Sequence, residues 1–217
     1  MALQGLIFDF DGLLVDTESA ILSAWQTLHT EDGMTADPAV MHAIVGHVDV
    51  DADLWRAYPL SHDRAALDVR LQTLARRLCR EAPLRPGVQE LLDAAAAAGL
   101  RCAVASNSTH PHVDGHLSVR GLRDRFTAVV CREDVPRGKP APDVYLAALR
   151  ALDLPPEDVI AFEDSMPGHE AAAAAGLRVA VVPNPTTVRD PFPHATWRYA
   201  SLADFTREHF ARSAGRV

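Results

Sequence analysis

Five short apolar segments recur along the chain, and stretches with helical periodicity separate most of them. The apolar segments are Leu3–Phe8, Leu100–Ser106, Thr127–Cys131, Val159–Phe162 and Arg178–Val182. Apolar runs of this length, rich in Val and Ile, are typical of strands buried on both faces of a parallel sheet. The helical patterns cover Val88–Ala98, Val113–Val119, Asp143–Leu152 and His169–Ala175. This alternation predicts an α/β fold with a doubly wound parallel sheet.

One interval breaks the alternation, because about ninety residues separate the first apolar segment from the second. It contains two apolar stripes with helical spacing: Ile21, Leu22, Trp25 and Leu28, then Leu67, Leu71, Leu74 and Leu78. We therefore predict an α-helical cap domain at residues 17–83, inserted after the first strand, and an α/β core made of residues 1–16 and 84–217. Such an insertion lies over the carboxyl ends of the strands, where open α/β sheets bind ligands, so it is placed to act as a lid.

Composition narrows the class of protein. The 217 residues include 29 acidic and 21 basic side chains, for a formal net charge of −8, which argues against a nucleic-acid partner. Hydrophobic residues make up 48% of the chain, which excludes intrinsic disorder. No apolar run approaches the roughly 18 residues of a membrane span, and the N-terminus has no signal pattern. We expect a cytoplasmic protein that is a monomer or a weak dimer.

The three cysteines, Cys79, Cys102 and Cys131, are far apart and show no metal-binding spacing. We expect them to be reduced and buried as small hydrophobic residues.

The first strand leads directly into Asp9-Phe10-Asp11-Gly12. With the strand period of two, both carboxylates point to the same side and repel each other unless a cation or a shared proton relieves them. Mg²⁺, which prefers oxygen ligands, is the natural partner. The alternative interpretation is an ordinary turn, since Asp and Gly are common turn formers.

Three further polar groups follow predicted strands or lie in the loops beyond them. Glu163-Asp164-Ser165 is either a second acidic pair or a helix N-cap. Ser106-Asn107-Ser108 either binds phosphate or caps the next helix. Lys139 lies between Gly138 and Pro140, which suits a charge held toward phosphate, although most lysines are solvated. Together these groups place acids, hydroxyls and one Lys at a single edge of the sheet.

These four segments, in this order, resemble the four motifs of the haloacid dehalogenase superfamily. The motifs are Asp9-Phe10-Asp11-Gly12-Leu13-Leu14-Val15-Asp16-Thr17-Glu18, Ser106-Asn107-Ser108, Gly138-Lys139-Pro140-Ala141-Pro142-Asp143 and Phe162-Glu163-Asp164-Ser165. The strongest similarity is to the beta-phosphoglucomutase-like phosphatases with a helical cap, and it extends from Leu3 to Val182. Asp11 argues against dehalogenation, because the dehalogenases of this superfamily lack an acid at that position and need no metal. The resemblance therefore implies phosphoryl transfer.

The resemblance also implies a role for each residue of the site. Asp9 is the expected nucleophile, which forms an aspartyl phosphate, and Asp11 is the expected general acid and base. Ser106, the Asn107 N–H and Lys139 are expected to bind the phosphoryl oxygens. The Asp9 carboxylate, the Asp11 carbonyl and Asp164 are expected to hold Mg²⁺, with Glu163 behind the ion or acting through a bound water.

The family's cap specificity loop corresponds to residues 44–49, so Gly46, His47 and Asp49 are candidate substrate-specificity residues. Mutases of this group have a His where this chain has Ile21 and an Arg where it has Asp49, which favours hydrolysis of a substrate with one phosphate. His110, His112 and His116 follow the second strand and are not the usual ligands of Mg²⁺, although contact with substrate stays open.

Three functions are compatible with the sequence. A phosphatase acting on a small phosphorylated metabolite such as a sugar phosphate is favoured. A sugar-phosphate mutase shares the same core motifs. A non-catalytic phosphate-binding module on the same fold is the third, because a fold alone does not imply activity.

Overall fold

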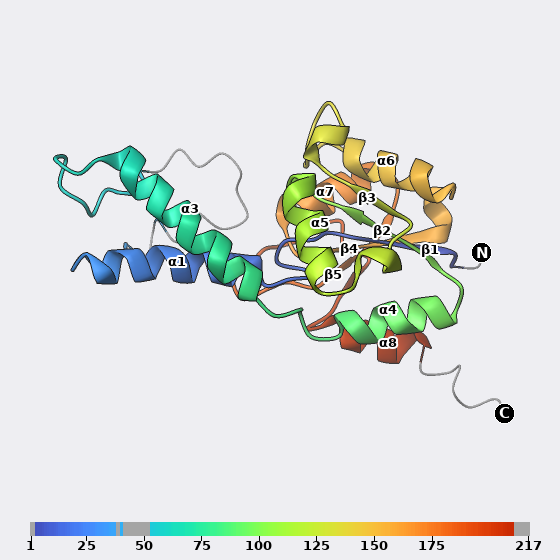
Figure 1. Cartoon of the computed structure of the whole chain (residues 1–217). Helices are drawn as coiled ribbons and strands as arrows, with labels where there is room; N and C mark the ends of the chain where they lie inside the picture. Colours follow the sequence, from blue (N-terminus) through green and yellow to red (C-terminus); the bar gives the residue numbers. More distant parts are fainter. Residues whose placement is uncertain (1–2, 38–39, 41–52, 211–217) are drawn as a thin grey trace. The chain divides into compact units, whose positions relative to one another are not determined.

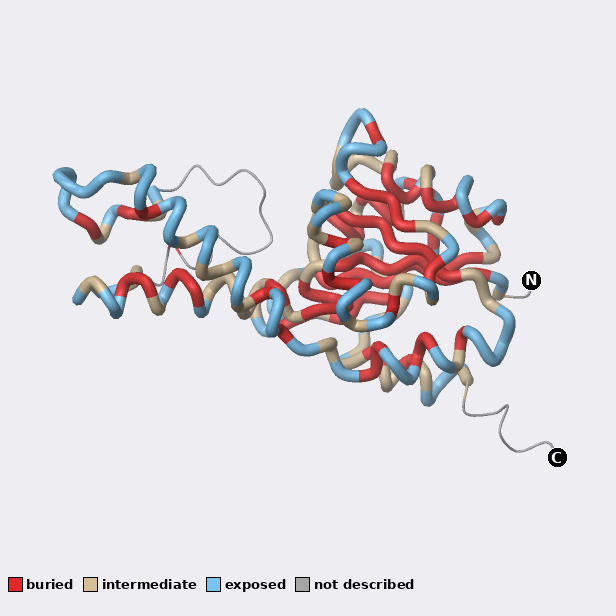
Figure 2. Tube along the Cα trace, in the orientation of Figure 1, coloured by how far each residue is buried: buried red, intermediate tan, exposed pale blue. Residues whose placement is uncertain are grey.

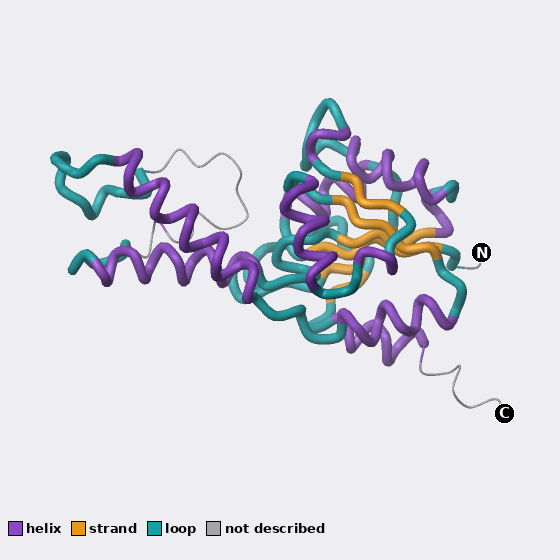
Figure 3. Tube along the Cα trace, viewed as in Figure 1, coloured by secondary structure: helices purple, strands orange, loops and turns teal. Residues whose placement is uncertain are grey.

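The computed structural model describes residues 3–37, 40 and 53–210. The chain divides into two compact units, one made of Met1–Val15 with Leu84–Val217 and the other of Asp16–Pro83. All the strands that the structure describes lie in the first unit (Figure 3). In the part of the second unit that the structure describes, two long helices are the main elements. The predicted α/β fold with a helical insertion after the first strand is confirmed.

The first unit is built on a six-stranded sheet in the order β3-β2-β1-β4-β5-β6, and every neighbouring pair is parallel (Figure 1). Its strands are β1 (Gly5–Phe8), β2 (Arg101–Ala105), β3 (Ala128–Val130), β4 (Val159–Glu163), β5 (Arg178–Val181) and β6 (Trp197–Arg198). From β1 the chain adds β2 and β3 on one side of the sheet, and then adds β4, β5 and β6 on the other side. The order therefore reverses between β1 and β4, and ligands of open α/β sheets bind at this point.

The central strands are apolar because both of their faces are covered, and Figure 2 shows them as buried. Alternate residues such as Ile7, Ala103 and Ala161 pack in one cluster with α6 (Asp143–Leu152) and α7 (Met166–Ala174). On the opposite face the Phe8 and Phe162 rings stack with their centroids 5.0 Å apart. Burial on both faces holds the ends of β1 and β4 in fixed positions, and the candidate site begins there.

Besides α6 and α7, this unit contains the helices α4 (Val88–Ala97), α5 (His110–Val119) and α8 (Leu202–Phe210). Most of the helices of this unit match the sequence prediction. Both α5 and α7 begin three residues earlier than predicted, because the first turn of each contains a Pro, whose missing N–H is tolerated at that position. In α7 the Ser165 hydroxyl caps the helix by accepting a hydrogen bond from the Gly168 N–H.

The C-terminal part contains two elements that the apolar pattern does not predict. Strand β6 has only two residues and pairs with β5, which is too short to give a periodic signal. Helix α8 buries Phe205, whose ring meets Phe162 edge-on at 4.7 Å. These elements extend the sheet and cover its Phe162 face.

The helical unit consists mainly of α1 (Thr17–Glu31) and α3 (Arg64–Glu81). The side chains of Asp16 and Asp63 cap the two helices by accepting hydrogen bonds from backbone N–H groups in the first turn. Its small core comprises Trp25, Leu28, Val40, Trp55, Tyr58 and Leu67. The other members of the two predicted stripes are half-buried: Ile21, Leu22, Leu71, Leu74 and Leu78. The expected small separate core is therefore present, with part of each stripe at its margin.

Two smaller expectations also have an outcome. Cys79, Cys102 and Cys131 are all free and buried, as predicted. Among the residues that the structure describes, no helix combines the length and the apolar character that crossing a bilayer requires.

Candidate active site

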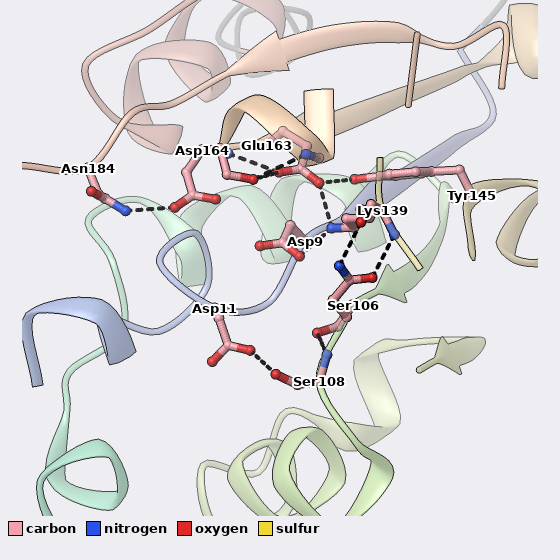
Figure 4. A network of polar contacts seen from close by, with 12 residues as sticks. Asp9, Asp11, Ser106, Ser108, Lys139, Tyr145, Glu163, Asp164 and Asn184 are labelled. Atoms are coloured by element: carbon pink, nitrogen blue, oxygen red, sulfur yellow. Dashed lines mark hydrogen bonds and ion pairs between the residues drawn. The ribbon is translucent and has the colours of Figure 1, made fainter. Parts of the chain in front are cut away.

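Two acidic pairs lie side by side at the carboxyl ends of β1 and β4. Asp9 and Asp11 follow β1, while Glu163 ends β4 and Asp164 follows it. Because Phe8 is paired with Phe162 in the sheet, the residues that come next are neighbours (Figure 4). The site thus forms at the reversal point of the strand order, where the fold is suited to bind a ligand.

The turn after β1 depends on Gly12. Its φ is +79°, a conformation that favours glycine, and a Cβ atom there would lie 2.2 Å from Asp164 Oδ2. The turn is closed by the Gly12 N–H, which donates to the Val15 carbonyl at 2.8 Å. Gly12 therefore lets the Asp11 segment pass close to Asp164.

Lys139 binds two of the acidic side chains. Its Nζ lies 2.5 Å from Asp9 Oδ1 and 2.6 Å from Glu163 Oε1. The lysine side chain is 4% exposed and that of Glu163 is fully buried, so these ion pairs are shielded from solvent. A lysine so placed supplies a fixed positive charge where the two acidic pairs meet.

The buried charges shift one another's pKa. Burial, helped by the carboxylates of Glu163 and Asp11, raises the pKa of Asp9 to about 8 although Lys139 opposes the shift. Burial lowers the pKa of Lys139, but the charges of Asp9 and Glu163 outweigh it and raise that pKa overall. Lys139 is therefore a permanent cation, and the cluster around it carries an excess of acidic groups.

This excess fits a bound divalent cation. Asp9, Glu163 and Asp164 are buried and each offers a carboxylate oxygen, and these oxygens lie within 4.8 Å of one another. Hard cations such as Mg²⁺ and Ca²⁺ prefer this donor type. Three carboxylates facing the single ammonium of Lys139 leave negative charge that a divalent ion would neutralise. The acidic cluster can thus hold a metal ion.

Asp11 lies in a second polar group beside this cluster. Its Oδ2 accepts a hydrogen bond from the Ser108 hydroxyl at 2.6 Å, and its Oδ1 lies 2.9 Å from His112 Nε2. The Asp11 and His112 side chains are 29% and 32% exposed. Burial lowers the pKa of His112, but its hydrogen bond to Asp11 and the charge of Asp11 outweigh burial and raise it. Asp11 is therefore oriented by two side chains but still reached by solvent.

The residues proposed to bind phosphate have defined positions at the end of β2. Ser106 is 1% exposed, and its Oγ accepts a hydrogen bond from the Ser108 N–H at 3.0 Å. The Asn107 side-chain amide makes two hydrogen bonds to the backbone of Lys139. Its Oδ1 accepts from the Lys139 N–H at 2.8 Å, and its Nδ2 donates to the Lys139 carbonyl at 3.2 Å. The Asn107 side chain thus fixes the loop that carries the lysine.

A family model described as haloacid dehalogenase-like hydrolase matches residues 6–182. The chain belongs to this family of hydrolases.

Several relatives cover nearly the whole chain. CbbY of Rhodobacter capsulatus is 34% identical over 216 residues, which is 94% of this chain and 95% of CbbY. Hexitol phosphatase B of Escherichia coli is 32% identical over 208 residues, with 92% and 93% covered. The crystal structure of CbbY from Rhodobacter sphaeroides in complex with phosphate has a TM-score of 0.75 and 29% identity, with 94% and 96% covered. A mutant of that protein was crystallised with xylulose-(1,5)bisphosphate.

Within this family framework, the structure adds residues that the sequence did not single out. Tyr145 in α6 is fully buried, and its hydroxyl donates a hydrogen bond to Glu163 Oε1. Glu163 Oε2 accepts from the Asp164 N–H and the Ser165 hydroxyl, each at 3.3 Å. The oxygens of Glu163 are thus engaged by the protein itself. A buried tyrosine needs a partner for its hydroxyl, and this was the available sequence signal.

Asn184 is the second unforeseen residue, and it lies three residues beyond the end of β5. Its Nδ2 donates to Asp164 Oδ2 at 2.7 Å, while its Oδ1 accepts from the backbone N–H groups of Thr186 and Thr187. The Asn184 amide therefore orients Asp164. The rule that ligands bind at strand carboxyl ends, applied to the fifth strand as well, would have identified it.

The candidate cap residues Gly46, His47 and Asp49 lie outside the described residues, as does the whole of the predicted specificity loop at residues 44–49. Ile21, the other residue that separates this chain from the mutases, lies in α1 and is half-buried.

Proposed function

We propose that this hydrolase is a Mg²⁺-dependent phosphatase that acts on a small phosphorylated metabolite, such as a sugar phosphate, through an aspartyl-phosphate intermediate. The observation that carries the proposal is the buried contact of Lys139 with both Asp9 and Glu163 beside Asp164. It combines a carboxylate nucleophile, a fixed cation and a cluster of hard oxygen ligands in one place.

Each residue then has one chemical task. A carboxylate oxygen of Asp9 attacks phosphorus, the ester P–O bond breaks, and Asp11 gives a proton to the departing alcohol oxygen. In the second step Asp11 takes a proton from water, whose oxygen attacks the phosphorus of the aspartyl phosphate and releases Asp9. The Ser106 hydroxyl, the Asn107 N–H and Lys139 bind the phosphoryl oxygens and offset their charge.

The metal ion has a set of residues suited to hold it. The carboxylates of Asp9 and Asp164 and the backbone carbonyl of Asp11 are the proposed ligands. Glu163 supports the site from behind, since its oxygens already bind Lys139, Tyr145 and Ser165. When bound, Mg²⁺ neutralises charge on the transferring phosphoryl group.

The helical unit is proposed to act as the cap that selects the substrate, with residues 17–83 as cap and the rest as catalytic core. We propose hydrolysis rather than isomerisation because Ile21 has no proton to transfer at the place where mutases of this group have a His. The names of the relatives, a hexitol phosphatase and a protein crystallised with a sugar bisphosphate, support a sugar-type substrate.

A substrate screen tests the proposal directly. Phosphorylated sugars, sugar alcohols and para-nitrophenyl phosphate are incubated with the protein and Mg²⁺, and released phosphate is measured. Protein carrying Asp9→Asn, purified in the same way, serves as the blank for contaminating phosphatases. We expect phosphate release by the wild-type protein alone, and equal release by both proteins would contradict the proposal.

A second assay separates hydrolysis from isomerisation. Incubation with beta-glucose 1-phosphate and catalytic glucose 1,6-bisphosphate should give free phosphate and little glucose 6-phosphate. Glucose 6-phosphate that accumulates faster than phosphate would identify a mutase.

A further inference from the structure

His112 has no role in the mechanism above, yet it contacts the proposed acid and base. Its Nε2 lies 2.9 Å from Asp11 Oδ1. A carboxylate oxygen only accepts hydrogen bonds, so Nε2 carries the proton and donates it toward Asp11. The other oxygen, Oδ2, accepts from the Ser108 hydroxyl at 2.6 Å. Both oxygens of Asp11 are thus bound by side chains, Ser108 from the loop after β2 and His112 from α5.

The imidazole of His112 is held in place by aromatic contacts. Phe10, the residue between the two acids, meets the His112 ring edge-on with centroids 5.6 Å apart. The His116 ring lies 4.6 Å from the His112 ring and also contacts Phe10, with centroids 5.8 Å apart, and Arg120 Nη1 lies 2.9 Å from His116 Nδ1. Two neighbouring rings therefore restrict the orientation of the His112 ring, so its N–H is aimed at Asp11 before any substrate binds.

The two partners of Asp11 differ in what they permit. A serine hydroxyl both donates and accepts, so Ser108 can satisfy Oδ2 whether or not that oxygen carries a proton. The Nε2–H of His112 only donates, so Oδ1 remains an acceptor in either state. The Asp11 proton is therefore directed to Oδ2 (Figure 4 shows the Asp11–Ser108 contact).

We propose that His112 is a positioning residue for general acid catalysis: it fixes Asp11 Oδ1, so that Oδ2 delivers the proton to the leaving group. This inference rests on the proposed phosphatase function. Without His112 the half-exposed Asp11 carboxyl can turn about its side-chain bonds, and proton delivery becomes less efficient.

The test compares two leaving groups. Phenyl phosphate releases a phenol with a pKa of about 10, which needs a proton to leave, whereas para-nitrophenyl phosphate releases a far more stable anion. The ratio of kcat/KM for phenyl phosphate to kcat/KM for para-nitrophenyl phosphate therefore reports on acid catalysis of the first step, because kcat/KM does not include the later hydrolysis of the aspartyl phosphate that both substrates share. A loss of folded protein lowers both rates equally and leaves the ratio unchanged.

Three variants complete the experiment. His112→Phe keeps a ring against Phe10 but removes the N–H, and we expect the ratio to fall about tenfold, part of the 10²–10⁴ that full acid catalysis contributes. His112→Gln restores a donor and should recover most of the ratio. His110→Gln is the control, because His110 binds Asp114 and Asp134 rather than Asp11, and it should leave the ratio unchanged.

The outcomes distinguish the inference from the function on which it rests. If wild-type protein cleaves neither ester, the phosphatase proposal itself is wrong. If it cleaves them but His112→Phe leaves the ratio unchanged, or His112→Gln fails to restore it, His112 does not position Asp11.

Discussion

The two halves of the candidate site differ most in how far solvent reaches them. The Asp9 and Lys139 side chains are 10% and 4% exposed, and Glu163 is fully buried among fixed hydrogen bonds. Asp11 and His112, by contrast, are about one-third exposed. A nucleophile gains from being fixed in a shielded cluster, because its charge interactions are stronger there. A group that must donate and accept protons gains from contact with water. In the proposed mechanism, the burial pattern thus separates attack at phosphorus from proton transfer.

The largest effect is expected in the buried half, from Asp9→Asn. The amide is isosteric but is not a nucleophile, so turnover should fall on the order of 10⁵-fold or more, as for loss of other nucleophiles. Borohydride trapping of the phosphorylated protein should modify Asp9 alone. Modification of Ser106, or a turnover that survives Asp9→Asn, would reassign the nucleophile.

Removal of the metal is expected to have the next largest effect, again through the buried half. Excess chelator should stop release of phosphate from para-nitrophenyl phosphate, and Mg²⁺ should restore it. Ca²⁺ should inhibit, because its larger and looser coordination shell misplaces Asp9 relative to phosphorus. Full activity in metal-free buffer would show that the cluster of Asp9, Glu163 and Asp164 has another purpose.

The exposed half should give a smaller and more selective loss. Asp11→Asn removes proton transfer but leaves the nucleophile, so kcat should fall about 10²–10⁴-fold. Single-turnover kinetics should show both slow formation and slow hydrolysis of the aspartyl phosphate. A variant that slows neither step would remove Asp11 from the mechanism.

The buried half is also expected to matter for stability. Tyr145→Phe removes one hydrogen bond to buried Glu163, and loss of such a bond to a charged group costs about 1.5–3 kcal/mol of the free energy of unfolding. Denaturant titration measures this change. Tyr199→Phe is the matched control, since its hydroxyl contacts His209 in an exposed position, and it should change stability by less than about 0.5 kcal/mol. Equal effects of the two variants would show that the Glu163 contact contributes little.

The same contrast explains what could be read from the sequence. Asp9, Asp11, Glu163 and Asp164 follow apolar strands, so local pattern and motif order placed them at one edge of the sheet. Lys139 was recognised by its fixed loop and by the resemblance. Local sequence specifies these positions because the carboxyl ends of the strands of a parallel sheet all lie at the same edge.

Residues that act through tertiary contacts were less visible. Tyr145 reaches Glu163 from α6, Asn184 reaches Asp164 from beyond β5, and His112 reaches Asp11 across 101 positions of sequence. No local periodicity encodes such pairs. The early starts of α5 and α7 have a related cause, since their first turns lack the apolar spacing that predicts a helix.

The last expected effect is a dependence of Mg²⁺ stabilisation on pH. Burial raises the pKa of Asp9 to about 8 in the metal-free protein, against an ordinary value of 3.8. Between these values the folded state keeps a proton that the unfolded state has lost, so the contribution of Asp9 to stability falls as pH rises toward about 8.

Mg²⁺ competes with that proton, and the affinity of the protein for Mg²⁺ should therefore increase with pH over the same range. At a fixed Mg²⁺ concentration the added stability should grow by up to about 1.4 kcal/mol per pH unit between about pH 6 and pH 8. Thermal unfolding with and without Mg²⁺ measures it, and Asp9→Asn, which lacks the titrating group, should abolish the pH dependence. A shift in Tm that is the same at both pH values in the wild-type protein would mean that Asp9 is not protonated in the absence of metal.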